Sequence, residues 1–287
     1  MTGTNAEVVR VRVPERSYRH DLRAVKIVFH RELLRFGSDR MRIVSGLVQP
    51  ALWLLVMGTG LSSLMSVGGG DVDLKTFIFP GVCAMSVMFT AMFSAASIVW
   101  DREFGFLREM LVAPVSRGAI VVGKCLGGAF VATAQGLVIV ALAGLAGVPY
   151  DPVLLLTLVG MLFLGAFALT AFGVALAARI TNMQSFFAVM QMAMMPMLFL
   201  SGALYPLSGL PAWLGVLTKL NPLTYAVDPM RQAVFDRLDL SPELERTFNA
   251  GITWNGWQVP VWLELVMVVG MGLGLLGLAI LQFRRGE

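Results

Sequence analysis

Six stretches of this chain contain no Asp, Glu, Lys, Arg or His, and each is long enough to form a helix that crosses a membrane. They occupy residues 43–70, 76–100, 125–150, 152–178, 180–218 and 265–283. An α-helix needs about 20 apolar residues to cross a hydrocarbon core about 30 Å thick. Because the stretches are continuously apolar instead of alternating with a period of two, they exclude a β-barrel. The pattern predicts an all-α polytopic membrane protein.

The composition supports this fold class. Hydrophobic residues make up 57% of the chain and charged residues 14%, whereas about 25% charged residues is usual in a soluble domain. Two cysteines are too few for a disulfide-rich secreted scaffold. These values exclude a soluble enzyme.

We expect six transmembrane helices within one domain of residues 43–283, preceded by an arm of residues 1–42 and followed by a tail of residues 284–287. The helices are placed near residues 43–65, 77–99, 119–147, 153–178, 184–207 and 259–283. The fifth stretch is about twice as long as one span requires, and prolines and aromatic residues in its later part indicate that the chain leaves the membrane there. Residues 208–258 then form an outer segment.

Basic residues give the orientation, because cytoplasmic segments carry an excess of Lys and Arg. About 17 basic residues fall on the side of the arm, the tail and the connection between spans two and three, against about five on the other side. We therefore expect both termini in the cytoplasm.

The arm is too long and too polar before the first span to be a cleavable signal peptide. Within it, residues 21–36 predict an amphipathic interfacial helix. Its apolar positions recur at spacings of three and four, and they are Leu22, Val25, Phe29, Leu33 and Phe36. Two interpretations fit this helix equally well: contact with anionic lipid, and pairing with a protein partner.

Ionisable residues are missing from the middle of the predicted spans, which disfavours proton-coupled carriers and pumps. Glu264 is expected to be a solvated carboxylate at the outer interface. Gln135 and Gln191 are the strongest buried polar candidates, and each could either bond a neighbouring helix or face a substrate.

No cofactor or metal site is predicted in this chain. Gly118, Gly123 and Lys124 match part of a phosphate-binding loop, but Cys125 stands where Ser or Thr is needed and no strand precedes the segment. We interpret Lys124 as a cation that extends its ammonium toward the interface. The histidines and cysteines lack the spacing of metal ligands.

Methionines and phenylalanines are abundant in spans two and five, where flexible thioethers and aromatic rings could line a pathway for varied apolar substrates. They could equally fill gaps in the bundle. Together with the two glutamines, the candidate substrate-lining residues are Met85, Met88, Met92, Gln135, Phe187, Gln191, Met194 and Phe199.

The connection DREFGFLREMLVAPVSR, residues 101–117, interleaves charges with apolar residues at helical spacing and then reaches Pro114. Such a helix could lie on the lipid surface, or it could act as a lever that docks into another protein.

Two segments resemble a known family. One is DREFGFLREMLVAPVSRGAIVVGK at residues 101–124, and the other is YPLSGLPAWLGVLTKLNPLTYAVDPMRQAVF at residues 205–235. Both are similar to ABC transporter type-2 permeases, particularly the daunorubicin-resistance-like drug exporter branch. The resemblance covers nearly the whole chain.

This resemblance implies a half-transporter, in which two six-span subunits, identical or sister, bind two cytoplasmic ATP-binding subunits that hold ATP and Mg. Residues 101–114 would be the coupling helix, whose contact candidates are Asp101, Arg102, Glu103, Phe104, Leu107, Arg108 and Glu109. A connecting helix beside it would use Phe29, Glu32, Leu33 and Phe36. Re-entrant outer helices would close an external gate formed by Tyr205, Pro206, Asn221, Pro222, Tyr225, Asp228 and Arg231.

The expected function is therefore that of a permease subunit, not itself an enzyme, in an ATP-driven exporter of hydrophobic or amphipathic small molecules in the cell membrane. Its expected partners are the ATP-binding subunits, a second permease subunit and lipid, and no nucleic acid. Two alternatives stay open: export of a lipid or lipid-linked glycan by the same mechanism, and an ATP-independent channel or carrier.

Overall fold

The computed structural model describes residues 18–60, 74–105, 115–207, 210–238, 251–254 and 256–285, and these residues are predominantly helical. The helices are α1 (Tyr18–Ser38), α2 (Arg40–Leu52) with a π-helical turn η1 (Trp53–Met57), α4 (Leu74–Glu103), α6 (Arg117–Val140), α7 (Pro152–Ala177), α8 (Met183–Phe199), α9 (Ala212–Leu220), α10 (Thr224–Phe235) and α12 (Val261–Arg285). A 3-10 turn, η3 (Ala143–Ala146), follows α6, and the short strands β1 (Thr253–Trp254) and β2 (Trp257–Gln258) pair antiparallel.

Five helices of the described chain are long and apolar enough to cross a membrane. They are Ile43–Gly60, Lys75–Glu103, Arg117–Val140, Pro152–Ala177 and Val261–Arg284, and the apolar helix Met183–Phe199 is shorter. These six helices follow the order of the six predicted spans. The predicted all-α polytopic membrane fold is confirmed.

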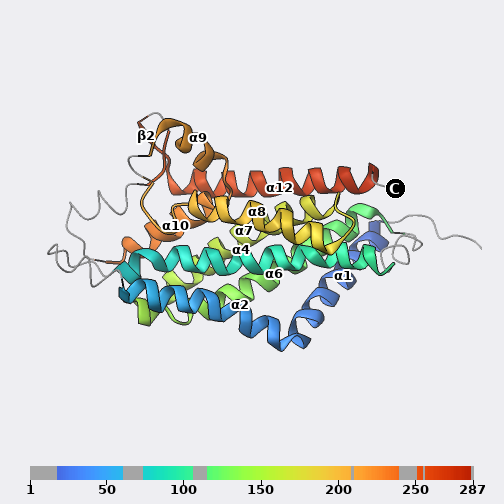
Figure 1. The fold of residues 1–287 in the computed structure, drawn as a ribbon, viewed down its shortest axis with the longest axis horizontal. Coiled ribbons are helices and arrows are strands. Elements are labelled where there is room, and N and C mark those ends of the chain that lie inside the picture. Colours follow the sequence, from blue (N-terminus) through green and yellow to red (C-terminus); the bar gives the residue numbers. More distant parts are fainter. Residues whose placement is uncertain are drawn as a thin grey trace, which may run out of the picture.

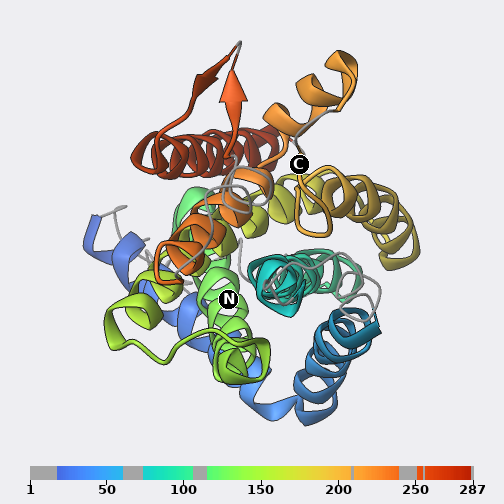
Figure 2. The same cartoon turned by 90° about the vertical axis from the view of Figure 1, so that its left-hand side faces the viewer.

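The long helices lie side by side along one axis (Figure 1). Helix α7 packs against α4, α6 and α12, and α4 also contacts α2 and α8 on its other sides. Viewed along the bundle, α4 lies inside the arrangement, between α2 and α8 (Figure 2). Helix α1 and the C-terminal end of α12 lie at one end, here called the α1 end, and α9, α10 and the hairpin lie at the opposite α10 end.

Several helix ends differ from the expected ones. Helix α4 continues to Glu103, four residues beyond the expected end, and α6 ends at Val140, before the η3 turn. Helix α8 ends at Phe199 instead of 207. The reason is a tight turn, because the Ser201 hydroxyl accepts a hydrogen bond from Ala203 N at 3.1 Å and Gly202 adopts a positive φ of 74°. Glycine takes that conformation without the steric cost that a side chain would add.

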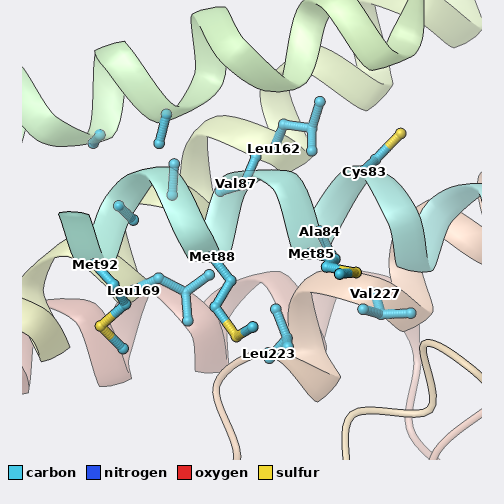
Figure 3. Close-up of a cluster of buried hydrophobic side chains, with 14 of the residues drawn as sticks. Cys83, Ala84, Met85, Val87, Met88, Met92, Leu162, Leu169, Leu223 and Val227 are labelled. Atoms are coloured by element: carbon cyan, nitrogen blue, oxygen red, sulfur yellow. The ribbon is translucent and has the colours of Figure 1, made fainter. Parts of the chain in front are cut away.

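The methionines of α4 belong to the core. Met85, Met88 and Met92 project from one side of α4 among Leu169, Leu223 and Val227 (Figure 3). Their exposed fractions are 1%, 0% and 0%, and Met194 of α8 is also buried. These four candidate substrate-lining residues therefore fill space between helices, since neighbours cover α4 on nearly all sides.

Helix α1 contains the predicted amphipathic helix of residues 21–36, but its most buried positions are shifted by one residue from the expected face, whose Val25, Phe29, Leu33 and Phe36 are half-buried. Ala24, Val28 and Glu32 are buried, whereas Leu22 of the expected apolar face is 51% exposed. This face packs along α6, where a Cβ added to Gly123 would lie 2.9 Å from Val28 Cβ. Glycines four residues apart allow such close approach of two helices.

The packing of α10 against α12 buries Glu264, which the sequence led us to expect in solvent. Its side chain is 0% exposed and lies near Asp228 of α10, and its two carboxyl oxygens have no hydrogen-bond partner among the described residues. The expectation of a solvated interfacial carboxylate is wrong, because α10 covers the first turns of α12.

Gly127→Ala is expected to lower the thermal stability of the purified chain in detergent. The added Cβ would lie 2.9 Å from Glu32 Cβ, and overpacking a close contact costs about 1–3 kcal/mol. The matched control is Gly274→Ala on α12, whose added Cβ would meet nothing within 4 Å. Equal stability of the two variants would contradict the close α1–α6 packing.

Glu264→Gln is expected to leave the melting temperature unchanged or to raise it by up to about 4 °C. Glutamine has nearly the same shape but cannot ionise, so it relieves the repulsion between two adjacent buried carboxyl groups. Glu103→Gln, on an exposed side chain, is the control and should not raise the melting temperature. A clear drop for Glu264→Gln would show that this site requires a carboxyl group.

Candidate functional site

A buried group of charged and polar side chains joins three helices at the α1 end. We call it the Lys124 cluster, and its members are Arg31 and Glu32 of α1, Ser97 and Asp101 of α4, and Lys124 of α6. The Lys124 ammonium lies 2.6 Å from Asp101 Oδ2 and 3.1 Å from Glu32 Oε1. It also donates a hydrogen bond to Ser97 Oγ at 2.9 Å. One ammonium therefore bonds acceptors on two other helices.

The cluster is balanced in charge and closed to solvent on most sides. The side chains of Lys124, Glu32 and Asp101 are 2%, 4% and 8% exposed. Arg31, at the rim, lies 2.5 Å from the same Asp101 oxygen and brings the total to two cations and two anions. The expectation that Lys124 extends toward the interface is wrong, since α1 covers it and supplies a carboxylate.

The base of α4 is held by further polar contacts. The Arg102 guanidinium donates hydrogen bonds to the carbonyl oxygens of Ala177, Ala178 and Ile180 at 3.3, 3.0 and 2.7 Å, at the end of α7. Glu103 Oε2 accepts a hydrogen bond of 3.2 Å from Met183 N, at the start of α8. The last turn of α4 is therefore bonded to its neighbouring helices.

These contacts revise the candidate coupling residues. Asp101 is buried, and Arg102 and Glu103 bond within the chain, although Glu103 is also exposed. Phe104 is 67% exposed and stacks edge-on against Trp100. Leu107, Arg108 and Glu109 lie outside the described residues.

Among the connecting-helix candidates, Glu32 is a member of the Lys124 cluster. Phe29 stacks edge-on against Phe130 of α6 with ring centroids 5.7 Å apart, and Leu33 and Phe36 are half-buried. The Arg35 guanidinium lies 5.0 Å from the centre of the Trp100 ring. The sequence indicated no role for Ser97 or Trp100, and for Lys124 it indicated only a cation at the interface.

A cavity of about 480 Å³ lies between α1, α2, α4 and α6, within the size range of ligand pockets. Its lining is mixed apolar and polar and consists of Phe36, Asp39, Met41, Ser45, Gly46, Gln49, Pro50, Phe89, Thr90, Phe93 and Gln135. Gln135 Nε2 also donates a hydrogen bond to Ile43 O at 3.0 Å. Gln135 therefore bonds a neighbouring helix, one of the two roles that the sequence left open, and it also lies on a cavity wall.

Phe93 also lines a smaller cavity of about 160 Å³ that includes Phe187 of α8. The two rings lie 5.8 Å apart, which brings α4 and α8 together beside the larger cavity. Gln191 and Phe199 lie on the exposed face of α8.

At the α10 end, polar side chains fix the turn after α8. Asn221 Nδ2 donates to Met197 O at 2.7 Å, Thr224 Oγ1 donates to Leu200 O at 3.2 Å, and Arg231 donates to Gly202 O. The Arg231 guanidinium also lies 4.1 Å from the centre of the Phe77 ring. Burial lowers the pKa of Arg231 to about 10, while Asp228 opposes this shift, so the side chain stays charged at neutral pH.

The remaining outer candidates are near this turn. The Tyr225 hydroxyl donates to Lys219 O at 2.9 Å, and Asp228 accepts a hydrogen bond of 2.8 Å from Gln232. Pro222 is buried, whereas Tyr205 and Pro206 are half-buried.

Known proteins share this sequence pattern. Residues 23–235 match the ABC-2 type transporter family. A putative transport permease, ycf38, of Cyanophora paradoxa is 31% identical over 208 residues, which cover 71% of this chain and 72% of the relative. The probable multidrug ABC transporter permease YbhR of Escherichia coli is 29% identical over 75% of this chain and 54% of its own length.

A probable doxorubicin resistance ABC transporter permease protein, DrrC, of Mycobacterium tuberculosis is 24% identical over 78% of this chain and 81% of the relative. The family match covers most of the chain, including α1, the Lys124 cluster and α10. This protein therefore belongs to the ABC-2 type transporter family and is a multi-pass membrane permease.

Proposed function

We propose that the chain is the permease subunit of an ATP-driven exporter that moves hydrophobic or amphipathic small molecules out of the cytoplasm or inner leaflet. The observation that carries the proposal is the way in which the base of α4 is fixed. Asp101, Arg102 and Glu103 bond α4 to its neighbours directly before residues 106–114. A force applied to that segment would reach several helices at once.

The α1 end faces the cytoplasm in this proposal. Basic residues gather there, namely Arg19, Arg23, Lys26, Arg31, Arg35, Arg40, Arg102, Arg117, Lys124, Arg179 and Arg284. The excess of Lys and Arg on cytoplasmic segments supports this orientation, with both termini inside the cell.

Energy would come from a separate ATP-binding subunit, present in two copies, that binds ATP and Mg. The segment from Asp101 to Pro114 would dock on it, with Phe104, Leu107, Arg108 and Glu109 as contacts. A second permease subunit, identical or sister, would complete the pathway. Rigid-body motion of packed helices is a common way to transmit such a change.

The larger cavity supports an amphipathic substrate, because aromatic rings line it beside amide and hydroxyl groups. Relatives named for multidrug transport and doxorubicin resistance point to drug-like molecules. On the other side of the membrane, Tyr205, Pro206, Asn221, Pro222, Tyr225, Asp228 and Arg231 would form or support the outer gate. Arg231 and Asn221 support it indirectly, since they bond the turn after α8.

The function is tested by co-purifying the chain in mild detergent with the ATP-binding subunit encoded beside it, followed by ATP hydrolysis with and without apolar drugs. We expect a stable complex with drug-stimulated hydrolysis. Glu109→Arg should lower that stimulation at least about fivefold, because it reverses a charge at the proposed docking surface.

Asp236→Arg is the matched control, since Asp236 is an exposed acid at the α10 end. If no ATP-binding subunit associates, an ATP-independent channel or carrier becomes the better explanation. Stimulation by lipids or lipid-linked glycans, but not by drugs, would favour the lipid alternative.

Phe93→Ala and Phe187→Ala are expected to raise the drug concentration for half-maximal stimulation about two- to tenfold, since losing an aromatic contact costs about 0.5–1.5 kcal/mol. Basal hydrolysis should be unchanged. Leu273→Ala, at an exposed apolar position on α12, is the control. Unchanged drug response in both phenylalanine variants would contradict a pathway beside these rings.

A further inference from the structure

The way in which α1 is attached to α4 depends on the Lys124 cluster. Helices α1 and α4 each pack along α6. Between α1 and α4 themselves, the described contacts include the ion pair of Arg31 with Asp101 and the stacking of Arg35 on Trp100. Ser97 Oγ of α4 also donates a hydrogen bond of 3.4 Å to Glu32 Oε1 of α1. Lys124 adds a further connection, because its ammonium bonds one carboxylate from each helix.

Lys124 is the buried cation that balances the charge inside the cluster. Glu32 and Asp101 are both buried carboxylates that bond its ammonium. Without Lys124 they would share a single cation, Arg31, which is 40% exposed and lies 2.5 Å from Asp101 Oδ2 and 3.9 Å from Glu32 Oε1. Like charges in a site of low dielectric repel strongly, and a buried charge that loses its partner is costly. Lys124 therefore neutralises the excess negative charge that two buried carboxylates and the partly exposed Arg31 would leave between α1 and α4.

The cluster bonds one particular part of α4, namely its C-terminal end. Asp101 lies at the last turn of α4, and Ser97 lies one turn earlier on the same face. The close approach of α1 to α6 at Gly123 and Gly127 brings Glu32 within reach of the Lys124 ammonium. The base of α4, the middle of α1 and the first turns of α6 are thus bonded at one point.

We propose that Lys124 is a positioning residue that clamps α1 and the base of α4 onto α6, so that movement of the segment after α4 displaces the three helices as one body. This inference rests on the proposed function. Lys124 need not touch substrate or the ATP-binding subunit. Its role is to keep hydrolysis by that subunit coupled to the movement of the spans.

The test compares transport per ATP hydrolysed in the purified complex reconstituted with its ATP-binding subunit. Lys124→Met should assemble and hydrolyse ATP, but transport per ATP should fall at least about tenfold, because the two carboxylates now repel. Lys26→Met, which removes a lysine from the exposed face of α1, is the matched control and should behave as wild type.

A rescue variant separates the clamp from a merely structural role. Adding Glu32→Gln and Asp101→Asn to Lys124→Met removes the repulsion and leaves Arg31, whose side chain is 40% exposed to solvent, as the one charge of the cluster. Transport per ATP should then return to within about threefold of wild type. If Lys124→Met does not assemble, Lys124→Gln takes its place, because its amide can still donate one hydrogen bond but carries no charge.

Two results would overturn the clamp. One is an assembled Lys124→Met or Lys124→Gln complex with wild-type transport per ATP, which would leave Lys124 with a structural role alone. The other is a triple variant that stays as uncoupled as the single variant. A wild-type chain that binds no ATP-binding subunit would instead overturn the proposed function, and this inference with it.

Discussion

The burial of the Lys124 ammonium organises the α1 end of this permease. A lysine so far from water must be paired, and here two carboxylates and a hydroxyl from α1 and α4 surround it. Because the partners come from different helices, pairing requires α1 to lie against α6, and the glycines of α6 allow this. The amphipathic helix is consequently an integral part of the bundle, with Arg31 and Arg35 at its polar rim.

The two ends of the bundle use polar groups differently. At the α1 end, charged side chains pair with one another across helices, so the contacts depend on charge balance. At the α10 end, Asn221, Thr224 and Arg231 bond backbone carbonyl oxygens left without partners where α8 stops. Between the ends, the core is mainly apolar, with Met88 and Met92 of α4 fully buried and single polar side chains such as Gln135 among them. Two polar anchors thus hold a tightly packed apolar middle.

The sequence was sufficient to predict the fold class. A continuously apolar stretch of this length can cross a membrane as a helix, in which its backbone groups bond one another. The sequence did not predict which side chains would pair when they come from helices far apart in the chain. Lys124 pairs with Glu32, which is 92 positions away in the chain, and with Asp101, which is 23 positions away. For the methionines of α4, the sequence pattern is the same whether they fill a core or line a pathway. Glu264 was misplaced for the same reason, since its burial depends on α10. Gln135 was recognised because an amide in an apolar helix needs a partner wherever the helix packs.

The exposed faces of the helices separate into two kinds. Along α12, the outward residues Val266, Leu273, Leu278 and Leu281 are apolar, as expected for contact with lipid tails. Helix α8 instead exposes Gln191 in its middle, and α2 exposes Gln49 on the wall of the larger cavity. An amide facing hydrocarbon without a partner costs about 1–3 kcal/mol. These amides interrupt faces that otherwise expose apolar side chains, such as Val48 of α2 and Met192 of α8. Such mixed chemistry suits the pathway and the second permease subunit that the proposed function requires.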